Sequence, residues 1–286
     1  MESNNDLLLR INERYASLSK GQKRIAQFIT NNYDKSAFLT AAKLGALVGT
    51  SESTIVRFAY ALGCDGYPEL QRSLRELARN RLTNAQRMEL NGQLDTRDIL
   101  MNTLKADMGN IRSTIENIDP EAFENAVNAM LKARTVYVLG LRSSTSLAQF
   151  LGYYLGFVLY DVRIVSGFSD VYEQLVRISP DDLCFGISFP RYSTRTVDAL
   201  AMAKGQGAHV VALTDCDVSP LARWADDCLL ARSDMASFAD SLVAPLAVIN
   251  ALIAALGAKR KDEVQDRFDR LEGMWNMQGV YVNSED

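Results

Sequence analysis

The chain has 286 residues, of which 48% are hydrophobic and 23% are charged, and its formal net charge is −4. These values are typical of a folded globular protein and exclude a disordered or fibrous chain, and the length predicts about two domains. The first residues are polar and interrupted by charges, so we expect no secretory signal. The longest apolar segment, residues 242–258, is shorter than the ~20 residues that cross a bilayer, so we expect no membrane partner.

Few side chains in this sequence are suited to binding a transition metal. There are four cysteines and one histidine, and the cysteines are widely spaced with no C-x-x-C pair. Thiols without a disulfide or zinc pattern are typical of a reducing compartment. We therefore predict a cytoplasmic protein with free cysteines, no metal site and no cofactor.

Charge is distributed unevenly along the chain. Residues 1–80 carry 11 basic and 8 acidic side chains, a net charge of +3, whereas the remainder carries 20 and 27, a net charge of −7. This asymmetry fits a small DNA-binding domain attached to an acidic body, although alone it does not separate that arrangement from chance.

The N-terminal segment is predicted to be entirely helical. Ser19, followed by Gln22 three residues later, is a capping-box pattern and begins a helix. A second helix follows in "TAAKLGALVG", where we expect Leu44, Leu47 and Val48 on one face. A third helix, "STIVRFAYALG", has apolar residues at helical spacing and is predicted to end at its final glycine.

The second and third of these helices are separated by a short polar segment, which is the layout of a helix-turn-helix. Ser51 is predicted to cap the third helix with its side-chain oxygen, and Arg57 is able to bind a guanine through two hydrogen bonds. Glu52 either accepts from a cytosine amine or only favours the helix dipole. The candidate DNA-binding residues are Lys43, Ser51, Glu52, Ser53, Thr54 and Arg57. The alternative is an ordinary helical bundle in which "TSEST" only begins a helix.

Beyond residue 80 the pattern changes twice. Residues 81–118 are polar and then helical, which predicts a linker followed by a docking helix. In residues 119–258, apolar β-branched runs alternate with helical stretches, which is typical of a parallel sheet covered on both faces. Residues 259–286 are predicted to form a charged helix and a tail. The predicted fold is therefore an all-α helix-turn-helix domain (residues 1–80) joined to a three-layer α/β domain of the flavodoxin-like or Rossmann-like kind.

The segment from Leu18 to Leu74 resembles the N-terminal domain of the RpiR/MurR family of bacterial transcriptional regulators. The matching pattern is S-x-x-T-[IV]-V-R-F-x-x-x-L-G followed by G-[YF]. In this chain it is formed by Ser51, Thr54, Ile55, Val56, Arg57, Phe58, Leu62, Gly63, Gly66 and Tyr67. The resemblance implies that this segment binds a double-stranded DNA operator.

Residues 119–258 resemble the sugar isomerase (SIS) domain that the same family carries. The first strand-to-helix turn, "GLRSS", fits the pattern G-x-x-S-S, and "FGISFPRYSTRTVDALAMAKGQGAHVVALTD" fits the second half of the domain. Both turns are expected at the carboxyl edge of the sheet, where helix N-termini favour anions. The resemblance implies that their hydroxyl groups hold a phosphate. The candidate ligand-binding residues are Arg142, Ser143, Ser144, Glu173, Ser188, Arg191, Tyr192, Ser193, Thr194 and Thr196.

Two departures from the usual SIS loops bring arginines toward this predicted site. Arg142 stands at the second glycine of the usual first loop, G-x-G-x-S. The usual second loop is S-x-S-G-x-T, where this chain reads "SFPRYSTRT" and places Arg191 and a tyrosine. Arginine binds carboxylate or phosphate through parallel hydrogen bonds, so we expect a smaller anion-binding cavity. The alternative is that either arginine pairs with an acid such as Glu173 or Asp170.

These observations favour a transcriptional regulator, not an enzyme, whose SIS domain senses a small anionic metabolite such as a sugar phosphate or a small carboxylate. The alternative is an isomerase-like enzyme with a vestigial DNA-binding head. Isomerisation needs a general base, for which Glu173 is the candidate, since His209 begins a predicted strand and is expected in a packing or surface role. The resemblance also implies a homodimer or tetramer, and paired heads would require a palindromic operator.

Overall fold

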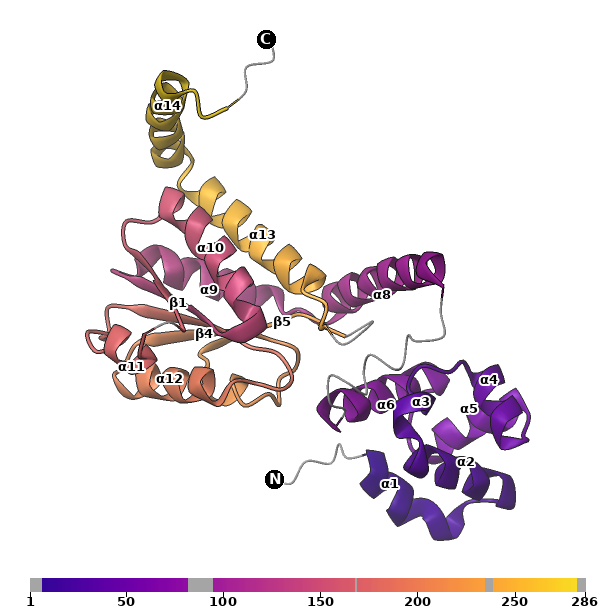
Figure 1. Cartoon of the computed structure of the whole chain (residues 1–286). Helices are drawn as coiled ribbons and strands as arrows, with labels where there is room; N and C mark the ends of the chain where they lie inside the picture. Colours follow the sequence, from indigo (N-terminus) through magenta and orange to yellow (C-terminus); the bar gives the residue numbers. More distant parts are fainter. Residues whose placement is uncertain (1–6, 82–94, 168, 235–238, 282–286) are drawn as a thin grey trace. The chain divides into compact units, whose positions relative to one another are not determined.

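The structure is a computed structural model that describes residues 7–81, 95–167, 169–234 and 239–281 (Figure 1). The described residues form two compact units. One extends to Met101 and includes Ala239, and the other comprises Asn102–Asp234 and the residues from Asp240 onward. Most of the predicted linker, residues 82–94, lies outside the described residues. The domain boundaries predicted at residues 80, 118 and 258 remain predictions.

The first unit is helical, as the sequence predicts. Its elements are α1 (Leu7–Arg14), the 3-10 turn η1 (Tyr15–Ser17), α2 (Lys20–Asn31), α3 (Tyr33–Ser36), α4 (Ala41–Val48), α5 (Glu52–Ala61) and α6 (Tyr67–Arg81). Ser19 accepts from the backbone N–H of Gln22, and the Gln22 side chain accepts from the backbone N–H of Ser19, so the capping box is confirmed. Ile25, Leu44 and Phe58 are fully buried in the core that these helices share.

Leu47, which is predicted on the same face of this helix as Leu44 and Val48, is 61% exposed. The short helix α4 buries Ala41, Leu44 and Gly45, and it packs on α5. At about 100° per residue these positions share one narrow face, and Leu47 falls on its flank. The helix α4 is only about two turns long and buries this single face.

The second unit is built on a parallel sheet with the strand order β2-β1-β3-β4-β5. The strands are β1 (Val136–Gly140), β2 (Val162–Val165), β3 (Leu183–Ile187), β4 (His209–Thr214) and β5 (Asp227–Leu230). They fall within the region of alternating apolar runs and helical stretches predicted in residues 119–258, and the predicted α/β class is confirmed. Every residue of β1 and β3 is buried, as is usual for central strands with helices on both faces.

Helices cover both faces of this sheet (Figure 1). One face carries α9 (Pro120–Lys132), α10 (Thr145–Val158) and α13 (Val243–Lys259), and the other carries α11 (Val171–Gln174), α12 (Thr194–Gly205) and the 3-10 turn η3 (Ala222–Trp224). Along β1, Val136 and Val138 belong to the first core, whereas Tyr137 and Leu139 belong to the second. The helix after β1 and the helix after β3 lie on opposite faces, so the carboxyl ends of these strands form the topological switch point.

The helix α8 (Thr96–Asn117) packs on the second unit through buried polar side chains. Asn110 donates to the carbonyl of Asp234 (3.0 Å) and accepts from its N–H (3.3 Å). Thr114 Oγ1 accepts from the N–H of Arg232 (2.9 Å). These contacts satisfy backbone groups of the segment that follows β5, which has no neighbouring strand there among the described residues.

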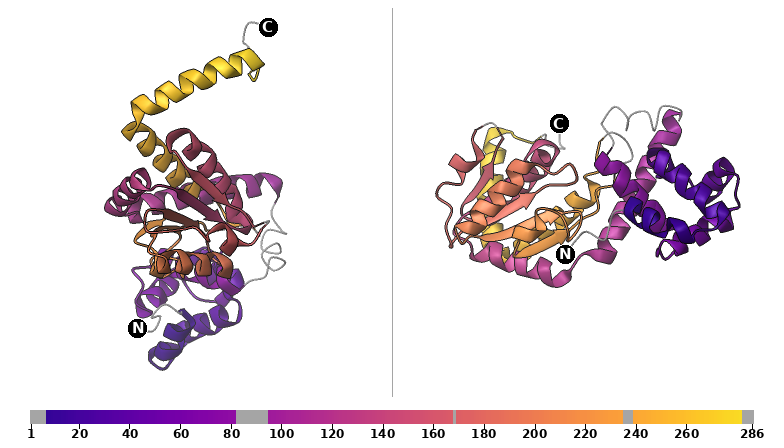
Figure 2. Two further views of the ribbon diagram at one scale, coloured as in Figure 1. Left: turned by 90° about the vertical axis from the view of Figure 1, so that its left-hand side faces the viewer. Right: turned by 90° about the horizontal axis from the view of Figure 1, so that it is seen from below.

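The last described helix, α14 (Lys261–Gln278), projects from the second unit (Figure 2). No helix in the described part of the chain is by itself long and apolar enough to cross a membrane. The one pair that passes this test together, α13 with α14, is bent by 99°.

Candidate functional site

In the first unit, α4 and α5 form a helix-turn-helix around Gly49. Gly49 ends α4 with φ = +69°, a left-handed conformation that glycine adopts at little cost. The N–H of Thr50 donates to the carbonyl of Gly45 (2.8 Å), and Arg24 of α2 donates to the carbonyl of Gly49 (3.2 Å). Hydrogen bonds from two sides therefore fix the turn that aims α5.

The start of α5 presents exposed polar side chains. Glu52, Ser53 and Arg57 are exposed, Thr54 is half-buried, and Lys43 of α4 is exposed. The Nε of Arg57 lies 3.4 Å from the carbonyl oxygen of Ser53, one turn earlier. The opposite face of α5 is buried in the core, so its polar face is exposed. An exposed polar face is what a recognition helix needs to enter the major groove of DNA.

The prediction that the Ser51 side chain caps α5 is wrong. Ser51 occupies the N-cap position, but its hydroxyl makes no hydrogen bond to the backbone of the helix. Its Oγ instead lies 2.9 Å from both Ser53 Oγ and Thr54 Oγ1. The Ser51 hydroxyl therefore hydrogen-bonds with the hydroxyls of Ser53 and Thr54 and not with a backbone N–H at the start of α5.

Tyr60 lies on the same exposed side of α5 as Ser53 and Arg57, and it was not among the predicted DNA-binding residues. It is 58% exposed and lies three residues after Arg57 and seven after Ser53, which places all three on one side of α5. Its spacing from Ser53 and Arg57 can be read from the sequence, so helical periodicity alone identifies Tyr60 as a member of this side.

In the second unit, a cavity of about 540 Å³ lies at the carboxyl ends of the strands. Its lining comes from the segments that follow β1, β2 and β3: Leu141, Arg142, Gly167, Arg191, Tyr192, Ser193, Thr194 and Arg195. This is the switch point of the sheet, where ligands of open α/β folds bind. Half of the ten predicted ligand residues line the cavity, and Arg195 lines it without having been predicted.

The predicted ligand residues outside this lining are Ser143, Ser144, Glu173, Ser188 and Thr196. Ser143 and Glu173 are exposed, and the other three are buried. Ser188 Oγ accepts from the N–H of Ser193 (3.2 Å), so it supports the cavity loop from below. Thr196 Oγ1 is buried and has no hydrogen-bond partner among the described residues. The roles of these five residues in ligand binding remain predictions.

Local geometry positions the two loops of the cavity. A Cβ on Gly140 would lie 2.5 Å from the carbonyl oxygen of Ser144, so only glycine lets the 3-10 turn η2 (Arg142–Ser144) fold back on β1. Ser193 caps α12, because its Oγ accepts from the N–H of Thr196. The cavity therefore lies against the N-terminus of α12, whose partial positive charge favours anions.

Arg142 and Arg191 are the only described residues other than glycine with a positive φ, +58° and +62°. This conformation costs a side chain with a Cβ roughly 1–2 kcal/mol, and such strain gathers at functional sites. Both arginines line the same cavity. Among the described residues, the Arg142 guanidinium makes no ion pair with Glu173 or Asp170, so the predicted alternative does not apply to Arg142.

Tyr192 connects the cavity to the end of β4. Its hydroxyl donates to Asp215 Oδ1 (2.6 Å), which also lies 3.3 Å from Thr214 Oγ1. Burial, with the charge of Asp215, raises the pKa of Tyr192, so the phenol stays protonated and remains a donor. Asp215 was not predicted, because it stands 23 residues after Tyr192 and meets it only through the pairing of β3 with β4.

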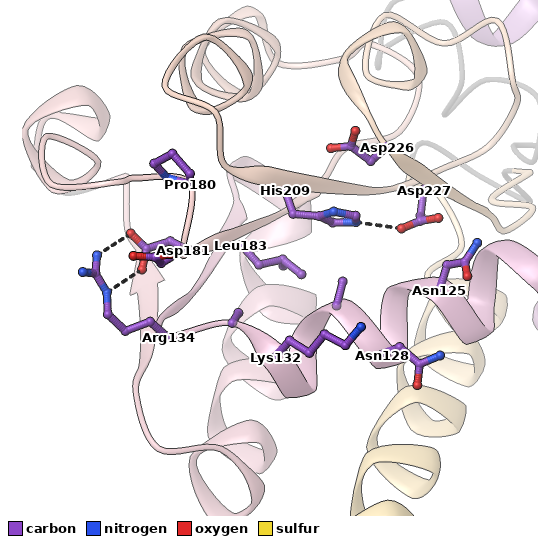
Figure 3. Close-up of a pocket in the computed structure, with 13 residues that line it drawn as sticks. Asn125, Asn128, Lys132, Arg134, Pro180, Asp181, Leu183, His209, Asp226 and Asp227 are labelled. Carbon is purple, nitrogen blue, oxygen red and sulfur yellow. Dashed lines mark hydrogen bonds and ion pairs between the residues drawn. The ribbon is translucent and has the colours of Figure 1, made fainter.

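A larger cavity, of about 810 Å³, lies at the opposite, amino edge of the sheet (Figure 3). It is lined by α9 and by residues that begin or precede β3, β4 and β5. His209 Nε2 lies 2.8 Å from Asp227 Oδ2, and the packing or surface role expected for this histidine remains a prediction. Asp226, a further lining residue, pairs with Lys204.

Arg134 and Asp182 form the best-connected pair at this amino edge. Arg134 donates from Nε (3.1 Å) and from a terminal nitrogen (2.8 Å), and Ser179 donates from its N–H (2.9 Å) and its hydroxyl (3.0 Å). Burial raises the pKa of Asp182, but the hydrogen bonds from Arg134 and Ser179 outweigh it, so this pKa lies below its usual value. Charges that are already paired at the amino ends of strands indicate a structural role.

Comparison with known proteins defines the class. Residues 5–80 match the model of the helix-turn-helix domain of the rpiR family, and residues 129–255 match the model of the SIS domain. The chain is therefore a helix-turn-helix transcriptional regulator with a SIS domain.

Relatives and solved structures agree with this class. The chain is 28% identical to the HTH-type transcriptional regulator HexR of Pseudomonas aeruginosa, over 93% of this chain and 94% of that one. It is 32% identical to the sugar isomerase domain of an RpiR transcription factor from Sphaerobacter thermophilus, with a TM-score of 0.59 over 61% of this chain and 98% of that one. It shares the fold of Vibrio vulnificus NanR at 22% identity, with a TM-score of 0.57 over 97% of this chain and 100% of that one. The chain belongs to the RpiR family.

Proposed function

We propose that this regulator binds a double-stranded DNA operator as a homo-oligomer and that a small anionic metabolite, a sugar phosphate or a small carboxylate, changes its affinity for that operator. The observation that carries the proposal is the cavity at the switch point. It contains two left-handed arginines, and its lining has no carboxylate among the described residues. Strain kept at an arginine-lined cavity is explained by a ligand that the arginines bind.

Further features support an anion at this position. The N-terminus of α12 borders the cavity through Ser193, Thr194 and Arg195, and its partial positive charge favours an anion. The Vibrio vulnificus NanR structure, which shares this fold, is complexed with ManNAc-6P, a sugar phosphate.

The same lining argues against catalysis. Sugar isomerisation needs a general base within hydrogen-bond reach of the proton that it removes. Among the described residues, no aspartate, glutamate or histidine lines this cavity, and Asp215 accepts a hydrogen bond from Tyr192. We therefore assign the cavity a sensing role. Incubation with a panel of aldose and ketose phosphates is expected to give no conversion.

DNA binding is tested by selecting genomic fragments with the purified chain at stated salt concentrations. We expect enrichment of a palindrome with half-sites about one helical turn apart. Arg57→Ala should cost about 1–3 kcal/mol and relax the preference at one base position, because Arg57 is assigned to a base edge. We assign the exposed Lys43 to a phosphate of the DNA backbone, so Lys43→Ala should weaken binding to all sequences and lower the salt slope by about 1. Unchanged binding of Arg57→Ala would exclude the proposed recognition helix.

Ligand sensing is tested separately, with inorganic phosphate, sugar phosphates and small dicarboxylates. Ligands that raise the thermal unfolding temperature of the wild-type chain should also change its operator affinity. The shift should be lost in Arg142→Ala, whereas DNA binding without ligand should persist. If no anion stabilises the chain, the sensing role is wrong even where operator binding is found.

A further inference from the structure

The helix α8 docks on the second unit through polar side chains. Among its described residues, only Asn110 and Thr114 are buried, with 4% and 6% of each exposed. Leu104, Met108 and Ile115 are apolar, yet each is more than half exposed. Most helices of globular proteins dock the other way, with an apolar face on the core. The position of α8 therefore depends on hydrogen bonds more than on apolar burial.

These hydrogen bonds go to the segment that follows β5. Asn110 exchanges two of them with the backbone of Asp234, and Thr114 Oγ1 accepts from the N–H of Arg232 (2.9 Å). One turn before Asn110, the Asp107 carboxylate accepts from the hydroxyl of Ser241 (2.6 Å). A buried polar group that loses its partner is costly, so α8 must follow this segment when it moves or break these bonds.

The same segment is connected to the ligand cavity. Ala231 donates its N–H to the carbonyl of Thr214 (2.8 Å), at the end of β4. The carboxylate of the next residue, Asp215, accepts from the hydroxyls of Thr214 (3.3 Å) and Tyr192 (2.6 Å). Tyr192 lines the cavity. Hydrogen bonds, linked by short stretches of backbone, therefore join the wall of the cavity to α8.

The helix α8 also leads out of the second unit. The division between the two units falls within it, between Met101 and Asn102, so the chain passes from the helix-turn-helix unit into the second unit through this helix. A helix is hydrogen-bonded along its whole length, so a displacement where it docks is carried to its other end. Each docking bond contributes little net free energy, so a ligand's preference for one arrangement is enough to change how α8 docks.

We propose that Asn110 and Thr114 couple the ligand cavity to the helix-turn-helix unit. A ligand that moves the Tyr192 loop displaces the segment after β5 and changes the hydrogen bonds that position α8. This inference rests on the proposed function and adds the route by which the ligand affects the operator. Coupling is reciprocal, so a disturbance of the α8 contact must also be felt at the cavity.

Amide hydrogen exchange of the full chain tests this route without ligand or DNA. Tyr192→Phe should speed up exchange roughly 5-fold in residues 231–234 and in α8, the change expected from one lost hydrogen bond. Asn110→Ala should in turn speed up exchange in the loop between β3 and α12. The control element is α13, which belongs to the core on the other face of the sheet and should exchange at the wild-type rate. Acceleration confined to the mutated element in either variant would overturn the proposal.

Operator titrations test the coupling itself. The probe is the anion of the panel above, inorganic phosphate included, that stabilises the wild-type chain most. Asn110→Ala should keep the thermal shift and the operator binding without anion, but its anion-induced change in operator affinity should fall roughly 5-fold or more. The matched control is Asn117→Ala, at an exposed position of the same helix whose amide bonds only to Ser113, and it should keep the full response.

A second variant guards against misfolding of Asn110→Ala. Thr114→Val keeps the shape of the side chain, removes only the hydroxyl that binds Arg232, and should also reduce the response. A wild-type response that both variants retain in full would overturn the coupling and leave the proposed function intact. A wild-type chain whose operator affinity no anion changes would overturn both.

Discussion

Both cavities of the second unit are lined by charged side chains, at opposite edges of one parallel sheet. At the amino edge the acidic residues Asp182, Asp226 and Asp227 each have a basic partner. At the carboxyl edge the lining holds three arginines and, within the described part of the chain, no carboxylate. The larger cavity is thus the less suited to a ligand. Carboxylates that are already hydrogen-bonded at the amino edge stabilise the fold, whereas a lining rich in arginine at the carboxyl edge favours a bound anion.

The largest effect on stability is expected from removing the Asp182 carboxylate, which pairs with Arg134 at the amino edge. Asp182→Ala removes a buried acceptor of four hydrogen bonds and should lower the free energy of unfolding by about 2–3 kcal/mol. Both tryptophans, Trp224 and Trp275, lie in the second unit, so their fluorescence in urea follows this unit alone. The exposed neighbour Asp181→Ala is the control and should change stability little. Equal losses in both variants would remove the distinction between paired and unpaired charges.

The same pair should make stability depend on pH. Because the pKa of Asp182 is lowered in the folded chain, its contribution is present above the unfolded pKa of about 4. The contribution is lost as the pH falls through the lower folded value. The difference between the wild-type chain and Asp182→Ala should therefore be constant from about pH 6 to 8 and shrink below about pH 4. A difference that persists unchanged in acid would mean that the carboxylate charge contributes nothing.

The next largest effect is expected at the carboxyl edge, where stability and binding should change in opposite directions. Arg142→Gly relieves a left-handed conformation and should raise the free energy of unfolding by roughly 1 kcal/mol. It also removes a charged donor, so affinity for an anionic ligand should fall about 10–100-fold. Urea unfolding and calorimetric titration measure the two quantities on the same protein.

A conservative variant separates strain from charge at this position. Arg142→Lys keeps the positive charge and the Cβ, so it should keep the strain and part of the affinity. A stability gain in Arg142→Lys equal to that in Arg142→Gly would contradict the strain argument. A full loss of affinity in Arg142→Lys would instead mean that the planar geometry of the guanidinium is required.

The sheet was predictable from sequence, because its strands are continuous apolar runs, and so was the cavity edge, because turns after parallel strands meet there. Residues fixed by tertiary geometry were not predictable. The bond from Tyr192 to Asp215 depends on the pairing of adjacent strands, and the backbone of Arg142 is left-handed although its sequence does not require it. Ser51 was misassigned because neighbouring hydroxyls compete for the same short-range partners.

The smallest effect is expected from Tyr192→Phe, at the point where the carboxyl edge most resembles the amino edge. This variant removes the hydroxyl that donates to Asp215 and should lower stability by about 1 kcal/mol, because Thr214 still reaches that carboxylate. Because the pKa of Tyr192 is raised in the folded chain, the stability difference should be constant up to about pH 9 and should shrink as the pH rises through the unfolded pKa of about 10. If the difference instead stays unchanged above pH 10, Tyr192 ionises in the folded chain as readily as in the unfolded chain. The cavity loop would then be held by something other than this hydrogen bond.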